Sequence, residues 1–102
     1  MTGTVRSSEG LDPRRRRVLF RSWHRGIREM DLVLGRFADE NIDTLTDAEL
    51  DEYERLMEVP DRDLLKWVTD EAPVAANYDT PIFRRVKAFH MTPDDYLPGR
   101  RA

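Results

Sequence analysis

Residues 27–38, IREMDLVLGRFA, carry the strongest helical pattern in the sequence. Their apolar side chains recur at steps of three, four and three, at Ile27, Met30, Leu34 and Phe37. This spacing, which Val33 and Ala38 widen, is typical of the buried face of an amphipathic helix. Gly35 interrupts the pattern at a cost of about 1 kcal/mol relative to alanine, so we predict that it permits the close approach of another helix.

A preceding helix is predicted from Pro13 onward, because proline suits the first turn of a helix, where its missing N–H costs nothing. The apolar side chains of this helix are Val18, Leu19, Phe20 and Trp23. Gly26 then interrupts the pattern, either as a turn or as a point of close helix contact.

Three more helices are predicted after residue 41, each with a recognisable start. The start signals are the capping box Thr46 and Glu49, the pair Pro60 and Asp61, and the N-cap Thr80 before Pro81. The apolar side chains that follow them are Leu50, Tyr53, Leu56, Met57, Leu64, Leu65, Trp67, Val68, Ile82, Val86 and Phe89. No segment alternates with a period of two. The chain is therefore predicted to be all-α, a small bundle of about five helices over residues 13–91, with flexible tails at residues 1–12 and 92–102.

The charge of the chain is unevenly distributed, although the net charge of the 102 residues is only −3. Residues 1–28 contain eight basic and two acidic side chains, whereas residues 29–79 contain four basic and sixteen acidic ones. Residues 80–102 are basic again, with five basic and two acidic side chains. The sign changes between Arg28 and Glu29, and this junction is therefore a place to look for a partner.

The composition excludes several classes of site. The chain has no cysteine, which excludes disulfides, thiol nucleophiles and thiolate metal sites. Its two histidines, His24 and His90, could form a zinc site only with help from carboxylates. No phosphate loop is present, and no apolar run reaches the roughly 20 residues of a membrane span. No secretory or transit segment is recognisable, so we expect a bacterial cytoplasmic protein. Because the sites above are missing, we expect it not to be an enzyme and to have no catalytic or metal-binding residue. We also expect no direct membrane insertion.

One polar constellation, Arg25-Gly26-Ile27-Arg28-Glu29, stands at the junction of the first two helices. Gly26 leaves the backbone uncovered, so another surface can approach closely, and Arg25 offers a planar donor fork. Glu29 falls in the first turn of the next helix, where the helix dipole favours a carboxylate. The spacing leaves two interpretations open: a binding site, or a turn that needs glycine, followed by a carboxylate that only stabilises the helix.

The run Arg14–Arg17 supports an alternative function. A basic arm of this kind attracts nucleic acid, so the chain could be a generic helical adaptor or a nucleic-acid-associated regulator. Against this, the acidic middle of the chain repels phosphates. Arginine also outnumbers lysine by 15 to 2, a bias that codon usage alone produces. We therefore expect no nucleic-acid partner and keep the adaptor as the alternative.

The polar constellation and its surroundings resemble a known family, the succinate dehydrogenase flavinylation factors. These are also called FAD assembly factors or succinate dehydrogenase assembly factor 2. Residues 25–29, RGIRE, match the Arg-Gly-x-x-Glu signature of the family, and residues 60–67, PDRDLLKW, resemble its Pro-Asp-x-Asp-Leu-x-x-Trp stretch. Residues 45–53, with Leu45-Thr46, Glu49-Leu50 and Tyr53, resemble its third helix. The resemblance covers about residues 17–89.

The resemblance implies a five-helix assembly chaperone that is not an enzyme. Such a protein binds the flavoprotein subunit of succinate dehydrogenase, and in some bacteria that of fumarate reductase, and promotes covalent attachment of FAD to it. The flavin is joined to a histidine of that subunit, so His24 and His90 need no catalytic role. This chain is accordingly not expected to bind FAD or another cofactor tightly.

The motif also implies which residues of this chain touch the partner. Carried over residue by residue, it gives Arg25, Gly26 and Glu29 as the centre of the contact. Arg28 and Asp31 lie nearby and are weaker candidates. The Arg14–Arg17 run and the residues beyond His90 match no part of the family pattern, so no role is carried over to them.

Overall fold

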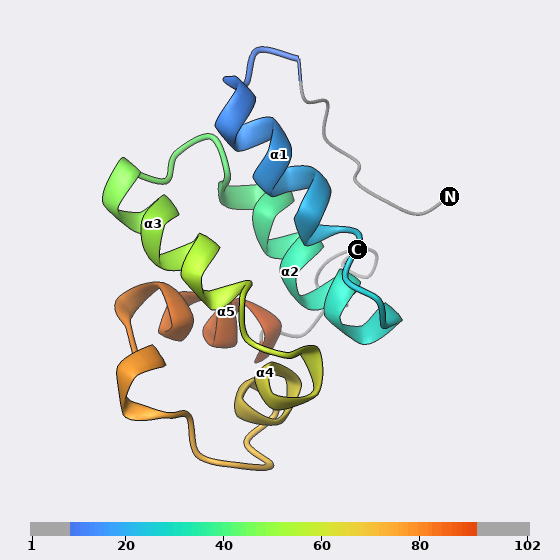
Figure 1. The fold of residues 1–102 in the computed structure, drawn as a ribbon, viewed down its shortest axis with the longest axis vertical. Helices are drawn as coiled ribbons and strands as arrows, with labels where there is room; N and C mark the ends of the chain where they lie inside the picture. The colour runs from blue at the N-terminus through green and yellow to red at the C-terminus, as the bar shows by residue number, and fades with distance from the viewer. Residues whose placement is uncertain (1–8, 92–102) are drawn as a thin grey trace.

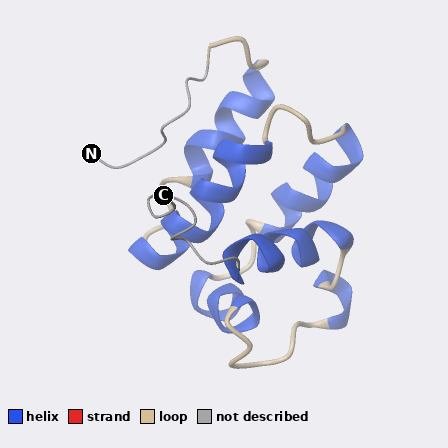
Figure 2. Cartoon of the chain, turned by 180° about the vertical axis from the view of Figure 1, so that it is seen from behind, coloured by secondary structure: helices blue, strands red, loops and turns tan. Residues whose placement is uncertain are grey.

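The computed structural model describes residues 9–91 and, within them, five α-helices and one short 3-10 helix (Figure 1). The elements are α1 Pro13–Ser22, α2 Arg28–Asn41, α3 Asp47–Leu56, α4 Asp61–Val68, η1 Ala76–Tyr78 and α5 Pro81–Met91. No strand occurs in this part of the chain (Figure 2). The all-α prediction is confirmed. Residues 1–8 and 92–102, most of the two predicted tails, lie outside the described residues.

The folded part begins earlier than the sequence indicates. Leu11, which the composition assigns to the N-terminal tail, is 8% exposed and belongs to the hydrophobic core. Asp12 is the N-cap of α1, and its carboxylate accepts a hydrogen bond from the Arg15 backbone N–H at 2.8 Å. Leu11 and Asp12, which the sequence assigns to the tail, are therefore held by burial and by a cap.

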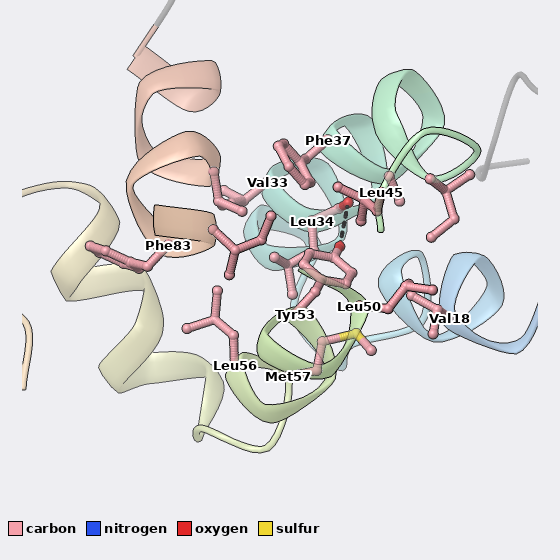
Figure 3. Packing of buried hydrophobic residues seen from close by; sticks show 14 of the residues in the cluster. Val18, Val33, Leu34, Phe37, Leu45, Leu50, Tyr53, Leu56, Met57 and Phe83 are labelled. Carbon is pink, nitrogen blue, oxygen red and sulfur yellow. Dashed lines mark hydrogen bonds between the residues drawn. The ribbon is translucent and has the colours of Figure 1, made fainter. Parts of the chain in front are cut away.

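Helix α2 is the centre of the bundle and contacts α1, α4 and α5. Its apolar stripe is almost fully buried, at Met30, Val33, Leu34, Phe37 and Ala38. Figure 3 shows this stripe meeting side chains of α1, α3 and α5. Burial of this face supplies the driving force that places α2 between its neighbours.

The predicted close approach at Gly35 is confirmed, and the neighbouring group is the indole ring of Trp23. A Cβ on Gly35 would lie 2.3 Å from Trp23 Cδ2, far inside van der Waals contact. Trp23 is the C-cap of α1, and its Nε1 donates a hydrogen bond to Asp39 at 3.1 Å. Helices α1 and α2 lie side by side (Figure 1). They can do so because α2 has no side chain at this crossing.

The core contains one buried polar group of note, the phenol of Tyr53 on α3. The hydroxyl donates to the Leu34 carbonyl at 3.1 Å and lies 2.8 Å from Ser22 Oγ (Figure 3). Burial raises the pKa of this phenol, so it stays neutral. The group joins α1, α2 and α3 without leaving a buried hydroxyl unpaired.

The other predicted starts and faces are largely as expected. The capping box of α3 is present, with Thr46 Oγ1 accepting from the Glu49 N–H at 3.1 Å and Glu49 accepting from the Thr46 N–H at 2.8 Å. The second bond holds the pKa of the Glu49 carboxyl below its usual value. Phe20 is the exception. The sequence groups it with the apolar side chains of α1, but it is 62% exposed, because it points away from the face that packs on α2 and α3.

Candidate functional site

The chain reverses direction between α1 and α2 through a turn centred on Gly26. This residue has φ +122°, a backbone conformation that side-chain-bearing residues rarely adopt. Of the two alternatives for Gly26, the geometry therefore confirms the turn. Gly26 is exposed, so its bare backbone is open to another molecule.

Asp31 holds the turn from the side of α2. Its Oδ1 accepts a hydrogen bond from the backbone N–H of Arg25 at 2.6 Å. The N-cap of α2 is Ile27, whose side chain cannot accept a bond from the first helical turn. Asp31, which lies within α2, therefore links the helix to the turn that precedes it.

Arg25 is held from the opposite side by the start of α4. Its Nε donates to Asp61 Oδ1 at 2.9 Å, and one Nη lies 2.7 Å from the same oxygen in an ion pair. That Nη also donates to the Val59 carbonyl at 3.4 Å. The side chains are only 11% exposed for Arg25 and 19% for Asp61. The donor fork predicted to face a partner is thus turned inward in this structure, into an ion pair largely withdrawn from water.

Arg28 and Glu29 are the exposed charges of the site. Both lie in the first turn of α2 and point to solvent. Glu29 is at the helix N-terminus, where the dipole favours its negative charge, as the spacing predicts. The surface that the turn offers is therefore made of bare backbone at Gly26 flanked by one guanidinium and one carboxylate.

The five predicted residues lie together at the Gly26 turn and the start of α2, but in two different settings. Gly26, Arg28 and Glu29 are exposed, whereas Arg25 and Asp31 are half-buried and hold the turn in shape. Sequence reasoning missed Asp61 as a member of the site. The signal was present in the stretch at residues 60–67, but the separation of 36 residues from Arg25 hides the pairing.

His24 and Phe20 form an exposed aromatic pair beside the turn. Their rings are stacked, with centroids 3.9 Å apart and planes inclined by 17°. The His24 Nδ1 also lies 2.7 Å from the Phe20 carbonyl oxygen. His24 is thus held against the end of α1 by its contacts with Phe20, one helical turn earlier.

The Arg14–Arg17 run is part of helix α1. Arg14 is paired with Glu54 of α3 at 3.0 Å, and Arg15 donates to the Ile42 carbonyl at 2.9 Å. The other two arginines of the run are exposed. The run thus lies in the helix predicted from Pro13 onward, and half of it fastens α1 to its neighbours.

Residues 9–91 contain no group of three or more histidine and carboxylate side chains placed to hold a metal ion. No helix in the same part of the chain is long and apolar enough to cross a membrane.

Comparison with known sequences shows the family of the chain. The model of a family described as the flavinator of succinate dehydrogenase matches residues 16–90. This chain belongs to that family. The match includes the Gly26 turn and all five α-helices apart from the first turn of α1 and the last residue of α5.

Curated relatives of the flavinator family come from bacteria and eukaryotes. The chain is 39% identical over 80 residues to the FAD assembly factor SdhE of Acetobacter pasteurianus, covering 78% of this chain and 73% of that protein. It is 41% identical over 83 residues to the mitochondrial succinate dehydrogenase assembly factor 2 of Meyerozyma guilliermondii, covering 80% and 57%. For the Danio rerio protein of the same name, the identity is 33% over 91 residues, covering 87% and 58%. The chain thus spans little more than half the length of these two eukaryotic relatives.

Proposed function

We propose that this protein is an assembly chaperone that binds the flavoprotein subunit of succinate dehydrogenase and promotes covalent attachment of FAD to it. Membership of the flavinator family supports the process, and the relatives named as assembly factors support the role. The observation that carries the mechanism is the exposed Gly26 turn, the one place where the family motif reaches the surface with bare backbone and two opposite charges.

The chaperone acts by contact and does not carry the reaction itself. The Gly26 backbone lets the partner approach closely, Arg28 can pair with a partner carboxylate, and Glu29 with a partner arginine or backbone N–H. Arg25 and Asp31 belong to the same contact site and keep the turn in shape. FAD becomes attached to the flavoprotein, and this chain needs no tightly bound cofactor for such a role.

The proposal also covers a second partner and the cellular location of the protein. The flavoprotein of fumarate reductase is a second partner that the same surface would serve, and the bacterial relative supports a place in the bacterial cytoplasm. Nucleic acid is not proposed as a partner, because Arg14 and Arg15 are engaged within the fold. The generic adaptor that uses a basic arm loses its main support for the same reason.

Two substitutions test the contact surface in cells that lack the chromosomal gene. Glu29→Ala removes an exposed charge, and Gly26→Arg places a long side chain on the bare backbone. Truncating a charge in a desolvated contact costs roughly 2–5 kcal/mol of binding, so we expect Glu29→Ala to lose most of the covalent flavin fluorescence of the dehydrogenase subunit in a denaturing gel. Gly26→Arg should lose it completely.

Glu40→Ala is the matched control, because Glu40 is an exposed glutamate near the other end of α2. It should support the wild-type flavin signal. Normal flavin levels with both Glu29→Ala and Gly26→Arg would disprove the contact surface. An unchanged flavin signal in the gene deletion itself would disprove the function.

A further inference from the structure

We propose that Asp61 is a positioning residue for the Gly26 turn, and that Arg25 serves the partner contact through Asp61 and not by touching the partner. The inference rests on the function proposed above. It adds a residue from α4, which lies far along the chain from the motif, to the machinery that shapes the contact surface.

The first observation is that one carboxylate reaches two consecutive motif residues. Asp61 Oδ1 accepts a hydrogen bond from Arg25 Nε at 2.9 Å and forms an ion pair with one Nη of the same guanidinium at 2.7 Å. Asp61 Oδ2 lies 3.5 Å from the position that a Cβ on Gly26 would occupy. The carboxylate therefore lies beside the turn, bonded to the side chain of Arg25 and close to Gly26.

The second observation is that Arg25 has its guanidinium largely withdrawn from solvent and engaged within the fold. Its side chain is 11% exposed, and its guanidinium also lies near the Val59 carbonyl, at 3.4 Å. Taking one partner away from such a pair leaves an uncompensated buried charge, which is strongly unfavourable. A flavoprotein that recruited Arg25 directly would have to leave Asp61 in that state, so the pair is better kept intact in the complex.

The third observation is that the start of α2 has no side-chain cap and is tied to its surroundings by two carboxylates. Its N-cap, Ile27, makes no side-chain hydrogen bond to the first turn, which is the turn that carries Arg28 and Glu29. Asp31 ties the Arg25 backbone to α2, and Asp61 ties the Arg25 side chain to α4. Without Asp61 the turn would be held from one side only, and the exposed charges would no longer be presented in one arrangement.

Asp61→Asn tests this inference, because it keeps the shape of the side chain and removes its charge. The matched control is Asp63→Asn, which alters an exposed aspartate in the same first turn of α4. We expect Asp61→Asn to raise the Kd for the purified flavoprotein subunit by roughly tenfold or more, as the loss of a charged tether in a buried pair implies. Its circular dichroism spectrum and folded fraction at 25 °C should stay those of the wild type. Asp63→Asn should leave the Kd unchanged.

A double-mutant cycle with Arg25→Gln separates positioning from direct contact. If Arg25 acts through Asp61, the double variant should bind no more weakly than the weaker single variant, because both remove the same tether. If Arg25 touches the partner independently, the two losses should multiply. A role in stability alone would move the melting temperature but would not produce this pattern in the Kd of the folded protein.

Three results would overturn the inference: an unchanged Kd for Asp61→Asn, losses that multiply in the double variant, or unfolding of Asp61→Asn at 25 °C, which would assign Asp61 to the fold. Failure of the proposed function looks different. In that case the wild-type protein itself would not bind the flavoprotein subunit, whatever stands at position 61.

Discussion

Gly26 and Gly35 flank the first half of α2, and each is needed for a different reason. Gly26 has φ +122°, and a Cβ there would meet its nearest neighbour, Asp61 Oδ2, at an ordinary 3.5 Å. Gly35 lies within a regular helix, but a Cβ there would come within 2.3 to 2.7 Å of three ring atoms of Trp23. The first glycine is required by backbone conformation and the second by lack of space.

This difference separates the part of the molecule that builds the fold from the part that meets a partner. Gly35 is buried and brings α1 against α2, so a change there acts on the packing of two helices. Gly26 is exposed and reverses the chain between the same two helices, so a change there acts mainly on the surface that we propose binds the flavoprotein. Substitutions at Gly35 should therefore mainly lower stability, and substitutions at Gly26 should mainly impair function.

Of the substitutions at the two glycines, Gly35→Val is expected to have the largest effect on stability. Overpacking a dense core usually costs about 1–3 kcal/mol, and this site should reach the upper end, because a rigid indole opposes the new side chain. For a domain of this size, each kcal/mol lowers the melting temperature by roughly 4–8 °C. Urea titration followed by circular dichroism would measure the loss. Wild-type stability would show that Trp23 does not lie against Gly35 in solution.

A change of background provides the control for this prediction. Gly35→Ala should destabilise the wild-type protein but stabilise a Trp23→Ala variant, in which the ring that opposes the Cβ is absent. The expected gain in that background is about 1 kcal/mol, the difference in helix propensity between alanine and glycine. The same sign in both backgrounds would contradict the steric explanation.

The sequence indicates that Gly35 needs a neighbour but not which one. Glycine is a poor residue for the middle of a helix, so its presence in a strong helical pattern already implies a close approach. The identity of the neighbour depends on how α1 crosses α2, which no local pattern contains. For the same reason the sequence groups Phe20 with the apolar side chains of α1 without showing that it lies on the exposed side of the helix.

The candidate site shows a similar division. The motif residues are consecutive, so the sequence predicts them as a group, and the turn at Gly26 follows from the glycine itself. The inward course of Arg25 cannot be predicted, because its partner Asp61 lies 36 residues away in another helix. Patterns of period 3.6 report which residues share a face, and they carry no information on pairs of charges that meet across two elements.

Gly26→Ala should have an intermediate effect on stability and a larger one on function. A residue with a side chain held in a sparsely populated backbone conformation costs about 1–3 kcal/mol, while the space beside Gly26 admits a methyl group. We expect a folded protein with a lower melting temperature, together with a clear loss of covalent flavin on the dehydrogenase subunit. Full flavinylation by this variant would show that the conformation of the turn does not matter to the partner.

The smallest effect is expected for Phe20→Ala, which tests whether α1 is held by its crossing with α2 or by its apolar content in general. Phe20 is 62% exposed and stacks only on His24 among the rings of the described residues. Its loss should change the free energy of unfolding by no more than about 0.5 kcal/mol, as for other surface positions. Leu19→Ala, the matched change at its buried neighbour, should cost about 2–5 kcal/mol. A loss of similar size at Phe20 would mean that another surface covers the ring in solution.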